Sequence, residues 1–170
     1  YYDMLTGLPN RTMFYSLYPL AIAKARQGKT LVVLMMIDLN HFKEINDTYG
    51  HDTGDRVLKH AGELLSAGIR AEDLVVRLGG DEFVIIIQDI QKEEEVAGIS
   101  KRIVDAFVNQ VPIEISGRDY KISASIGLTV IRPDDDLSAD EAKAKADQAM
   151  YMAKEQSKAM GYDTRLQRMN

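Results

Sequence analysis

Short, uniformly apolar runs alternate along this chain with segments in which apolar residues recur every three or four positions. The run Leu31–Ile37 is too short and too apolar for a surface helix, so it predicts a buried central strand. Similar runs predict strands at Leu74–Leu78, Glu82–Gln88, Val111–Ile115 and Tyr120–Ile131. These four strands come in adjacent pairs, which is typical of hairpins.

Helical spacing of apolar residues predicts helices around these strands. Asn10 and Gly28 supply a cap and a stop for the first of them. The expected helices are Asn10–Gln27, His41–Tyr49, a segment that Asp52–Asp55 opens, a segment marked by Val96–Phe107, and one from Ser138 to about Ala159. Because the order mixes hairpins with crossovers, we expect an α+β fold with a palm-like, largely antiparallel central sheet flanked by helices.

Two glycines separate two of the apolar runs and are followed by two acids. Gly79 and Gly80 can take the positive φ angles of a tight turn, so Asp81 and Glu82 should lie at the tip of a hairpin. Asp38 ends the central strand, and two strand ends can bring these acids together where a divalent cation could bind. That arrangement is typical of phosphate chemistry. The alternative is a solvated turn whose charges suppress edge pairing.

Composition narrows the function classes. With 21 basic and 26 acidic residues the net charge is -5, which argues against broad binding to nucleic acid. The absence of cysteine excludes a disulfide framework and thiolate zinc sites, and three scattered histidines argue against a histidine metal cage. At 170 residues, one domain is the simplest organisation. No run approaches the ~20 apolar residues of a membrane span, and the start has no signal-peptide pattern.

Ordered motifs carry a family resemblance. Gly79–Phe83 reads Gly-Gly-Asp-Glu-Phe, Asp3–Arg11 lies near the start, and Asp38–Asp47 is followed by Tyr49–Asp55. In order and spacing these motifs resemble the GGDEF domains, the diguanylate cyclases, over essentially the whole chain. The resemblance implies a nucleotidyl cyclase-like fold. It also implies the condensation of two GTP molecules into cyclic di-GMP with release of two pyrophosphates.

In this family the 3′-hydroxyl of each GTP attacks the α-phosphate of the other. The resemblance therefore implies a homodimer of domains, with cyclic di-GMP as product and allosteric inhibitor, and a location on the cytoplasmic side, where GTP is found. Because the opening motif begins at Asp3, we expect residues 1–170 to be a single GGDEF domain. It would be the output domain of a longer protein with an upstream sensory or dimerising domain, and that protein could be membrane-anchored.

For the metal, the resemblance implies Mg²⁺ or Mn²⁺ held by the side chains of Asp38 and Asp81 and by the backbone carbonyl of Leu39. Glu82 is implied as a further metal ligand or as the group that activates the attacking hydroxyl. Asp38, Asp81 and Glu82 are thus the expected catalytic residues. Mg²⁺ needs only one or two carboxylates plus substrate phosphates and keeps several waters, which suits this set.

For the substrate, the resemblance implies Asn46 and Asp55 as guanine contacts. A carboxylate accepts from N1–H and the 2-amino group of guanine, which adenine cannot match. Each residue has an ordinary alternative, because Asp55 could favour the first turn of a helix and Asn46 could cap or turn the chain. Free N–H groups around His41 and Phe42 could face the β- and γ-phosphates, and Gly80 is implied beside the same substrate.

Lys154 and Lys158 are the implied phosphate-binding cations. Lys154 lies in a motif similar to the family's Tyr-x-Ala-Lys, but the usual Gly-Arg-Asn that follows is Ser157-Lys158-Ala159 here. A point-charge ammonium thus replaces a forked guanidinium, which changes the contact geometry available to Lys158. The alternative for both lysines is a solvated helix C-terminus. A second departure is Asn40, where an aspartate is common.

Arg70 and Asp73 match the family's Arg-x-x-Asp product-inhibition motif, and Arg102 is a further candidate for that site. An arginine can fork onto a phosphate or a guanine edge while the aspartate accepts from the base. A surface salt bridge is the alternative. For the whole domain, two other functions stay open: a weak or inactive receptor for GTP or cyclic di-GMP, which Lys158 favours mildly, and an adenylyl cyclase, which the guanine contacts disfavour.

Overall fold

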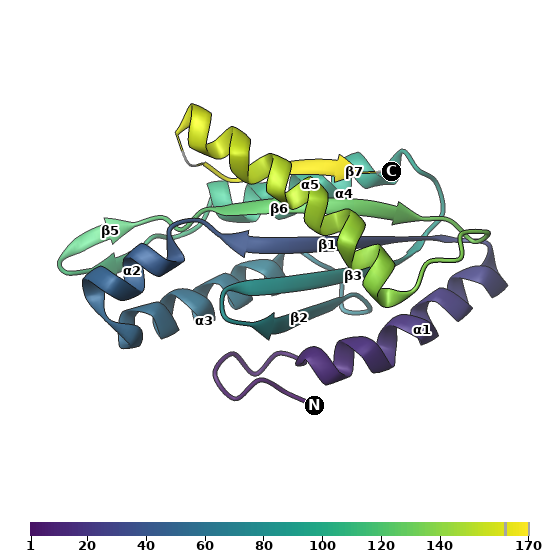
Figure 1. Ribbon diagram of the computed structural model, residues 1–170, viewed down its shortest axis with the longest axis horizontal. Helices are drawn as coiled ribbons and strands as arrows, with labels where there is room; N and C mark the ends of the chain where they lie inside the picture. Colours follow the sequence, from purple (N-terminus) through teal and green to yellow (C-terminus); the bar gives the residue numbers. More distant parts are fainter. Residues whose placement is uncertain (162, 170) are drawn as a thin grey trace.

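The computed structural model describes residues 1–161 and 163–169, with helices packed on both faces of a central sheet (Figure 1). The helices are α1 (Arg11–Gly28), α2 (Phe42–Tyr49), α3 (His51–Ala67), α4 (Glu95–Val108) and α5 (Ala139–Met160). The strands are β1 (Leu31–Leu39), β2 (Leu74–Gly79), β3 (Glu82–Ile90), β4 (Ile113–Ile115), β5 (Arg118–Tyr120), β6 (Ala124–Ile131) and β7 (Arg165–Met169).

The central sheet has the strand order β2-β3-β1-β6-β7. β1 pairs antiparallel with β3 and β6, β2 pairs antiparallel with β3, and β7 joins β6 in parallel. The expected α+β fold with a palm-like, largely antiparallel sheet is therefore confirmed. β4 and β5 form a separate two-stranded hairpin outside the central sheet (Figure 1).

β1 lies in the middle of the sheet and is buried on both faces. Its odd-numbered residues, such as Met35, belong to a core with α3 and α4, and its even-numbered residues, such as Leu34, belong to a core with α1 and α5. Strand side chains alternate between faces, so a strand covered on both sides reads as a continuous apolar run. This explains why Leu31–Ile37 predicts the central strand. Asp38 is the first charged residue of that strand and is half-buried.

The predicted strand Tyr120–Ile131 is wrong in its first part, because the chain leaves the small hairpin at Tyr120 and joins the central sheet only at Ala124. Between them, the buried side chain of Gln110 takes the place of a neighbouring strand. Its Oε1 accepts from the Ile122 N–H at 3.0 Å, and its Nε2 donates to the Ile122 carbonyl at 2.8 Å. One side-chain amide thus satisfies both backbone groups.

No sequence pattern predicts β7. Its residues Arg-Leu-Gln-Arg-Met show little apolar alternation, and the strand lies at the edge of the sheet, where only one side has to pair. The last helix begins as expected at its cap. The Ser138 hydroxyl accepts from the Glu141 N–H, and the Glu141 carboxylate accepts from the Ser138 N–H, both at 3.1 Å. α5 then runs one residue beyond the expected end at Ala159.

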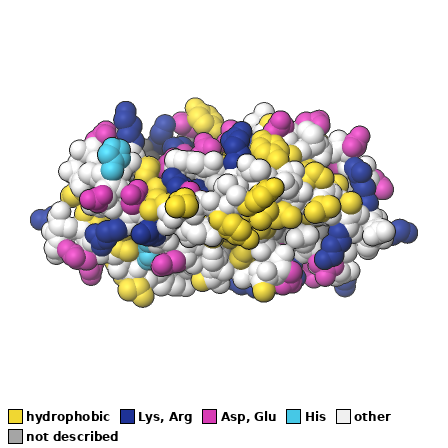
Figure 2. All heavy atoms as spheres, turned by 90° about the horizontal axis from the view of Figure 1, so that it is seen from below, with side chains coloured by type: hydrophobic (Ala, Val, Ile, Leu, Met, Phe, Trp, Pro, Cys, Tyr) yellow, Lys and Arg dark blue, Asp and Glu magenta, His cyan; other side chains and the backbone are white. Residues whose placement is uncertain are grey.

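The surface carries interspersed charges. Figure 2 shows the side of the molecule on which α1 lies, where acidic and basic side chains are mixed around a central group of hydrophobic side chains. A phosphate ligand on this face would have to be held by local groups rather than by a broad basic area. None of the helices formed by the described residues is both long enough and apolar enough to cross a membrane.

α5 lies directly on β6 because both contact surfaces are made of small residues. A Cβ placed on Gly127 would lie 2.0 Å from the backbone nitrogen of Met150 and 2.1 Å from the carbonyl oxygen of Ala146. Further alanines line the buried face of the helix. This close approach fixes the height of α5, and with it the position of Lys154, above the sheet.

Gly127→Ala is expected to lower the free energy of unfolding by about 1–3 kcal/mol, because the added methyl group has to push α5 away from β6. Urea denaturation would measure the change. Gly98→Ala is the matched control: a Cβ there meets nothing within 4 Å, and removing a glycine from the helix interior should be neutral or stabilise by up to about 1 kcal/mol. Equal stability of Gly127→Ala and the parent would contradict the close approach.

Candidate functional site

The turn between β2 and β3 is built from glycine. Gly79 has φ 149° and Gly80 has φ 54°, and both angles lie in the region that residues with a Cβ rarely adopt. The expected tight turn is present. It places Asp81 and Glu82 at the end of the hairpin, as the sequence pattern indicates.

Arg77 ties this turn to the start of the chain. Its Nε and Nη2 donate to the Gly80 carbonyl at 3.1 and 2.9 Å, and its Nη1 donates to the Asp3 carboxylate at 2.9 Å. Burial would raise the pKa of Asp3, but hydrogen bonds from Thr6 and the charge of Arg77 outweigh it and lower that pKa. Sequence reasoning missed this support, because the partners lie 74 positions apart. The available signal is that both residues lie within or beside motifs of the family resemblance.

Asp38 and Glu82 face each other across β1 and β3, where they are register partners. Paired residues project from the same face of a sheet, here the face that α1 and α5 cover. Asp81, in the turn just before Glu82, hydrogen-bonds to Asp38. Burial, this hydrogen bond and the charge of Asp38 raise the pKa of Asp81 to about 7, while the charge of Lys154 acts in the opposite direction. The carboxyl group of Asp81 therefore keeps its proton up to about neutral pH.

Lys154 on α5 forms an ion pair with the Asp38 carboxylate. The side chains are 32% and 13% exposed, respectively, so solvent screens this pair less than a surface pair. The position of Lys154 follows from the close packing of α5 on β6. Lys158, about one turn further along, pairs with Glu155 of its own helix at 3.1 Å, and both of these side chains are about half exposed.

Among the described residues, no three acidic or histidine side chains form a ready-made metal cage. Asp38 and Asp81 form a pair, Glu82 is exposed beside them, and the side chain of Leu39 is buried, which leaves its backbone carbonyl as a possible ligand. This set fits a hard cation. The charge of Asp38 helps to raise the pKa of Asp81, and a metal ion would neutralise this negative charge. Mg²⁺ commonly takes one or two carboxylates and keeps several waters.

Asn46 and Asp55 lie on the neighbouring helices α2 and α3, which meet at Gly50. Asn46 packs against Gly54, where a Cβ would lie 1.8 Å from the Asn46 Oδ1. Asp55, the next residue, is exposed. The alternative interpretations fail on geometry: α3 begins at His51, so Asp55 lies beyond its first turn, and Asn46 lies inside α2 rather than at its cap. Both predicted guanine contacts thus lie beside the α2–α3 junction.

The start of α2 follows directly on the end of β1. His41 has a left-handed backbone with φ 62°, and its side chain does not cap the helix that begins at Phe42. The first N–H groups of a helix have no partner within the helix, so they suit an anionic ligand. This helix start lies four residues after Asp38 in the chain, which brings a possible phosphate contact close to the acids.

Arg70 and Asp73 pair with each other just before β2. The Arg70 Nε donates to the Asp73 carboxylate at 3.2 Å, and its Nη2 donates to the Gln88 carbonyl at 2.5 Å. The salt bridge that was the alternative interpretation is present. Asp73 is nevertheless buried, and its other oxygen accepts from the Gln88 N–H at 3.1 Å. The pair therefore fixes Arg70 against the end of β3.

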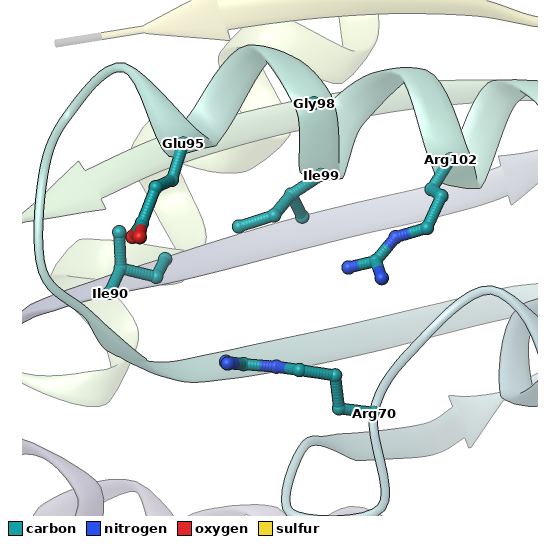
Figure 3. A pocket seen from close by; sticks show the side chains of 6 residues that line it. All are labelled: Arg70, Ile90, Glu95, Gly98, Ile99 and Arg102. Atoms are coloured by element: carbon teal, nitrogen blue, oxygen red, sulfur yellow. The ribbon is translucent and has the colours of Figure 1, made fainter.

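Arg70 also lines a cavity of about 420 Å³ together with Arg102 of α4. Figure 3 shows the two arginine side chains on opposite sides of this cavity, with Glu95 near one end. Ile90 and Ile99 contribute apolar lining. Two guanidinium groups beside apolar surface suit a ligand that combines phosphates with flat bases.

Comparison with known proteins places this geometry in a family. The family model "Diguanylate cyclase, GGDEF domain" matches residues 1–160. The bifunctional diguanylate cyclase/cyclic di-GMP phosphodiesterase MucR of Pseudomonas aeruginosa is 38% identical over 157 residues, which cover 92% of this chain and 22% of MucR. The chain thus spans about a fifth of the length of that curated relative.

Solved structures agree. The GGDEF domain of TpbB (YfiN) from Pseudomonas aeruginosa superposes with a TM-score of 0.87 at 32% identity, covering 100% of this chain and 95% of the other. The GGDEF domain of DgcB from Caulobacter crescentus, in complex with c-di-GMP, superposes with a TM-score of 0.81 at 29% identity, covering 98% of this chain and 94% of the other. Because its sequence, its fold and its motif positions all match, this chain belongs to the GGDEF family of diguanylate cyclase domains.

Proposed function

We propose that this domain is an active diguanylate cyclase, which condenses two GTP molecules into cyclic di-GMP and releases two pyrophosphates. The observation that carries the proposal is the contact between Asp38 and Asp81 at the end of the glycine turn, with Lys154 beside them. Membership of the family and the activity in the name of MucR support it.

Asp38, Asp81 and the Leu39 carbonyl hold Mg²⁺ or Mn²⁺ in this proposal. A bound ion stabilises charge on the α-phosphate and on the leaving pyrophosphate. Asp81 would give up its proton to act as a metal ligand, and Lys154, now paired with Asp38, would be available to a phosphate oxygen. Glu82, exposed across from Asp38, either joins the metal ligands or accepts the proton of the attacking 3′-hydroxyl.

Asp55 and Asn46 select guanine. The exposed Asp55 carboxylate accepts from N1–H and the 2-amino group, and the neighbouring Asn46 amide contacts the same base edge. An adenine base would leave the carboxylate without a donor, which is a strong basis for discrimination. The start of α2 at His41 and Phe42 receives the β- and γ-phosphates, and Lys158 adds a point charge at the end of α5.

Two domains are needed for turnover, because one domain holds one GTP and each 3′-hydroxyl attacks the other nucleotide. A face-to-face homodimer of domains is therefore part of the proposal. The chain spans only part of MucR, and we propose an upstream sensory or dimerising domain that controls how often two such domains meet. GTP as substrate places the reaction on the cytoplasmic side.

The cavity between Arg70 and Arg102 is the proposed inhibitory product site. The two guanidinium groups bind phosphates or guanine edges of cyclic di-GMP, while Asp73 holds Arg70 in place. The same cavity favours a second candidate function, in which the domain binds cyclic di-GMP as a receptor without producing it. The complete acid set, Asp38, Asp81 and Glu82, favours the cyclase over the receptor.

Asp81→Asn is expected to slow cyclic di-GMP formation about 100-fold or more, because an amide cannot replace the carboxylate charge at the metal. The assay incubates the domain with GTP and MgCl₂ at protein concentrations that force pairing, and identifies products by mass. Asp119→Asn, on the exposed β4–β5 hairpin, is the control and should keep the parent rate. Full activity of Asp81→Asn would refute the metal assignment.

Metal affinity should rise with pH up to about 7. The raised pKa of Asp81 means that a proton competes with the metal below that pH, so Mg²⁺ affinity should change by about tenfold per pH unit there and level off above it.

Without metal, the folded state binds this proton more tightly than the unfolded chain, so stability from this group falls as pH rises from 3.8 to about 7. Calorimetric titration with MgCl₂ measures the affinity, and Asp81→Asn should flatten the profile. A pH-independent affinity in the parent would contradict the raised pKa of Asp81.

Arg102→Ala is expected to raise the cyclic di-GMP concentration that halves the rate by about tenfold or more, since a charge-assisted contact is lost. The control is Lys101→Ala. Lys101 precedes Arg102 in the chain but forms an ion pair with Asp105, so its replacement should leave inhibition unchanged. If the parent binds cyclic di-GMP tightly but leaves GTP unconverted, the receptor function replaces the cyclase.

A further inference from the structure

Asn40 is a buried amide that joins three segments at the end of β1. Its backbone N–H donates to the Ser123 carbonyl, and its Nδ2 donates to the Ser123 hydroxyl, both at 2.9 Å. Its Oδ1 accepts from the Ser125 hydroxyl at 2.9 Å. The same Nδ2 also donates to the backbone carbonyl of Asp163, at 3.4 Å. Asn40, which is 3% exposed, therefore links β1 to β6 and to Asp163, just before β7.

The Asp163 carbonyl receives a second bond from α5. The hydroxyl of Ser157, a fully buried residue, donates to it at 3.2 Å. The next residue, Thr164, accepts from the Ala124 N–H through its hydroxyl at 3.2 Å. One backbone carbonyl thus connects the end of β1 with the last turns of α5.

These two ends carry the charged groups of the site. Asn40 comes two residues after Asp38, and Ser157 comes three residues after Lys154. Asp38 and Lys154 form the ion pair described above. The bonds through Asp163 therefore run parallel to that ion pair and hold the same two elements, β1 and α5, at a fixed separation.

Only an amide can occupy position 40 in this arrangement. Its nitrogen donates to two oxygens while its oxygen accepts from a hydroxyl, whereas a carboxylate has no proton to donate to the Asp163 carbonyl. A carboxylate would also bury a further negative charge two residues from Asp38. Here an asparagine at a position where an aspartate is common has a structural reason.

We propose that Asn40 and Ser157, acting through the Asp163 carbonyl, are positioning residues that set the distance between Asp38 and Lys154. The segment 163–169, including β7, becomes part of the support of the active site. When Lys154 leaves Asp38 for a phosphate, these bonds keep α5 from moving away with it. The catalytic consequence of this inference rests on the proposed function. The coupling of β7 to the acids is independent of the proposed function.

The kinetic test compares Asn40→Asp, which keeps size and loses the donor, with Ser157→Ala and the double variant. Misplacement of Lys154 should lower kcat about 10- to 100-fold in each single variant with a smaller change in KM, because the geometry in the transition state is affected most. The double variant should lose little more than either single one, since both remove bonds to one carbonyl. Ser100→Ala, which removes a comparable hydroxyl-to-carbonyl bond within α4, should keep the parent kcat.

A second readout does not depend on turnover. In the parent, hydrogen exchange of the 165–169 amides should slow when MgCl₂ and a non-hydrolysable GTP analogue are added. In Asn40→Asp, exchange of these amides should be faster than in the parent, and adding MgCl₂ and the analogue should not change it. If the parent makes no product but shows this coupling, the cyclase fails and the positioning role stands. If the parent is active while Asn40→Asp and Ser157→Ala retain kcat and parent exchange, the positioning role fails alone. Should Asn40→Asp not fold, Ser157→Ala decides by the same measurements.

Discussion

Contact between two carboxyl groups, those of Asp38 and Asp81, is the constraint on which this end of the molecule depends. Their like charges repel, which contributes to the raised pKa of Asp81, and the ammonium of Lys154 offsets part of this repulsion. The backbone has to hold the two acids in place nevertheless. β1 does so because it is buried on both faces, and the hairpin does so because Arg77 fastens its glycine turn to Asp3.

The position of the compensating lysine is set by packing rather than by electrostatics. α5 can approach β6 only because Gly127 lacks a side chain and alanines line the facing helix surface. A larger residue at this contact would lift the helix and carry Lys154 away from Asp38. The charge balance of the site therefore depends on the close packing of α5. Because Gly127 of β6 has no side chain, α5 comes close enough for Lys154 to pair with Asp38 at the end of β1.

Elements whose signal is local could be predicted from the sequence. The central strand is apolar throughout because both of its faces are covered, and the glycine turn is readable because only glycine tolerates its φ angles. The family motifs also indicated the acids Asp38 and Asp81, which the fold brings into contact. Features that depend on distant partners gave no comparable signal. β7 pairs at a sheet edge, and Gln110 interrupts a predicted strand by bonding Ile122 twelve positions away.

The two arginines and the acids lie at opposite ends of the β2–β3 hairpin. β2 has six residues, and at about 3.3 Å per residue the cavity beside Arg70 is roughly 20 Å from the glycine turn. A ligand in that cavity could not touch Asp81 of the same domain. It could act by shifting the hairpin or by controlling the approach of a second domain. β3 is paired with β1 along most of its length, and its core side chains are fully buried, so a shift would disrupt the buried core. Control of domain approach requires no such disruption, because the cavity opens at the surface, where Arg102 is exposed.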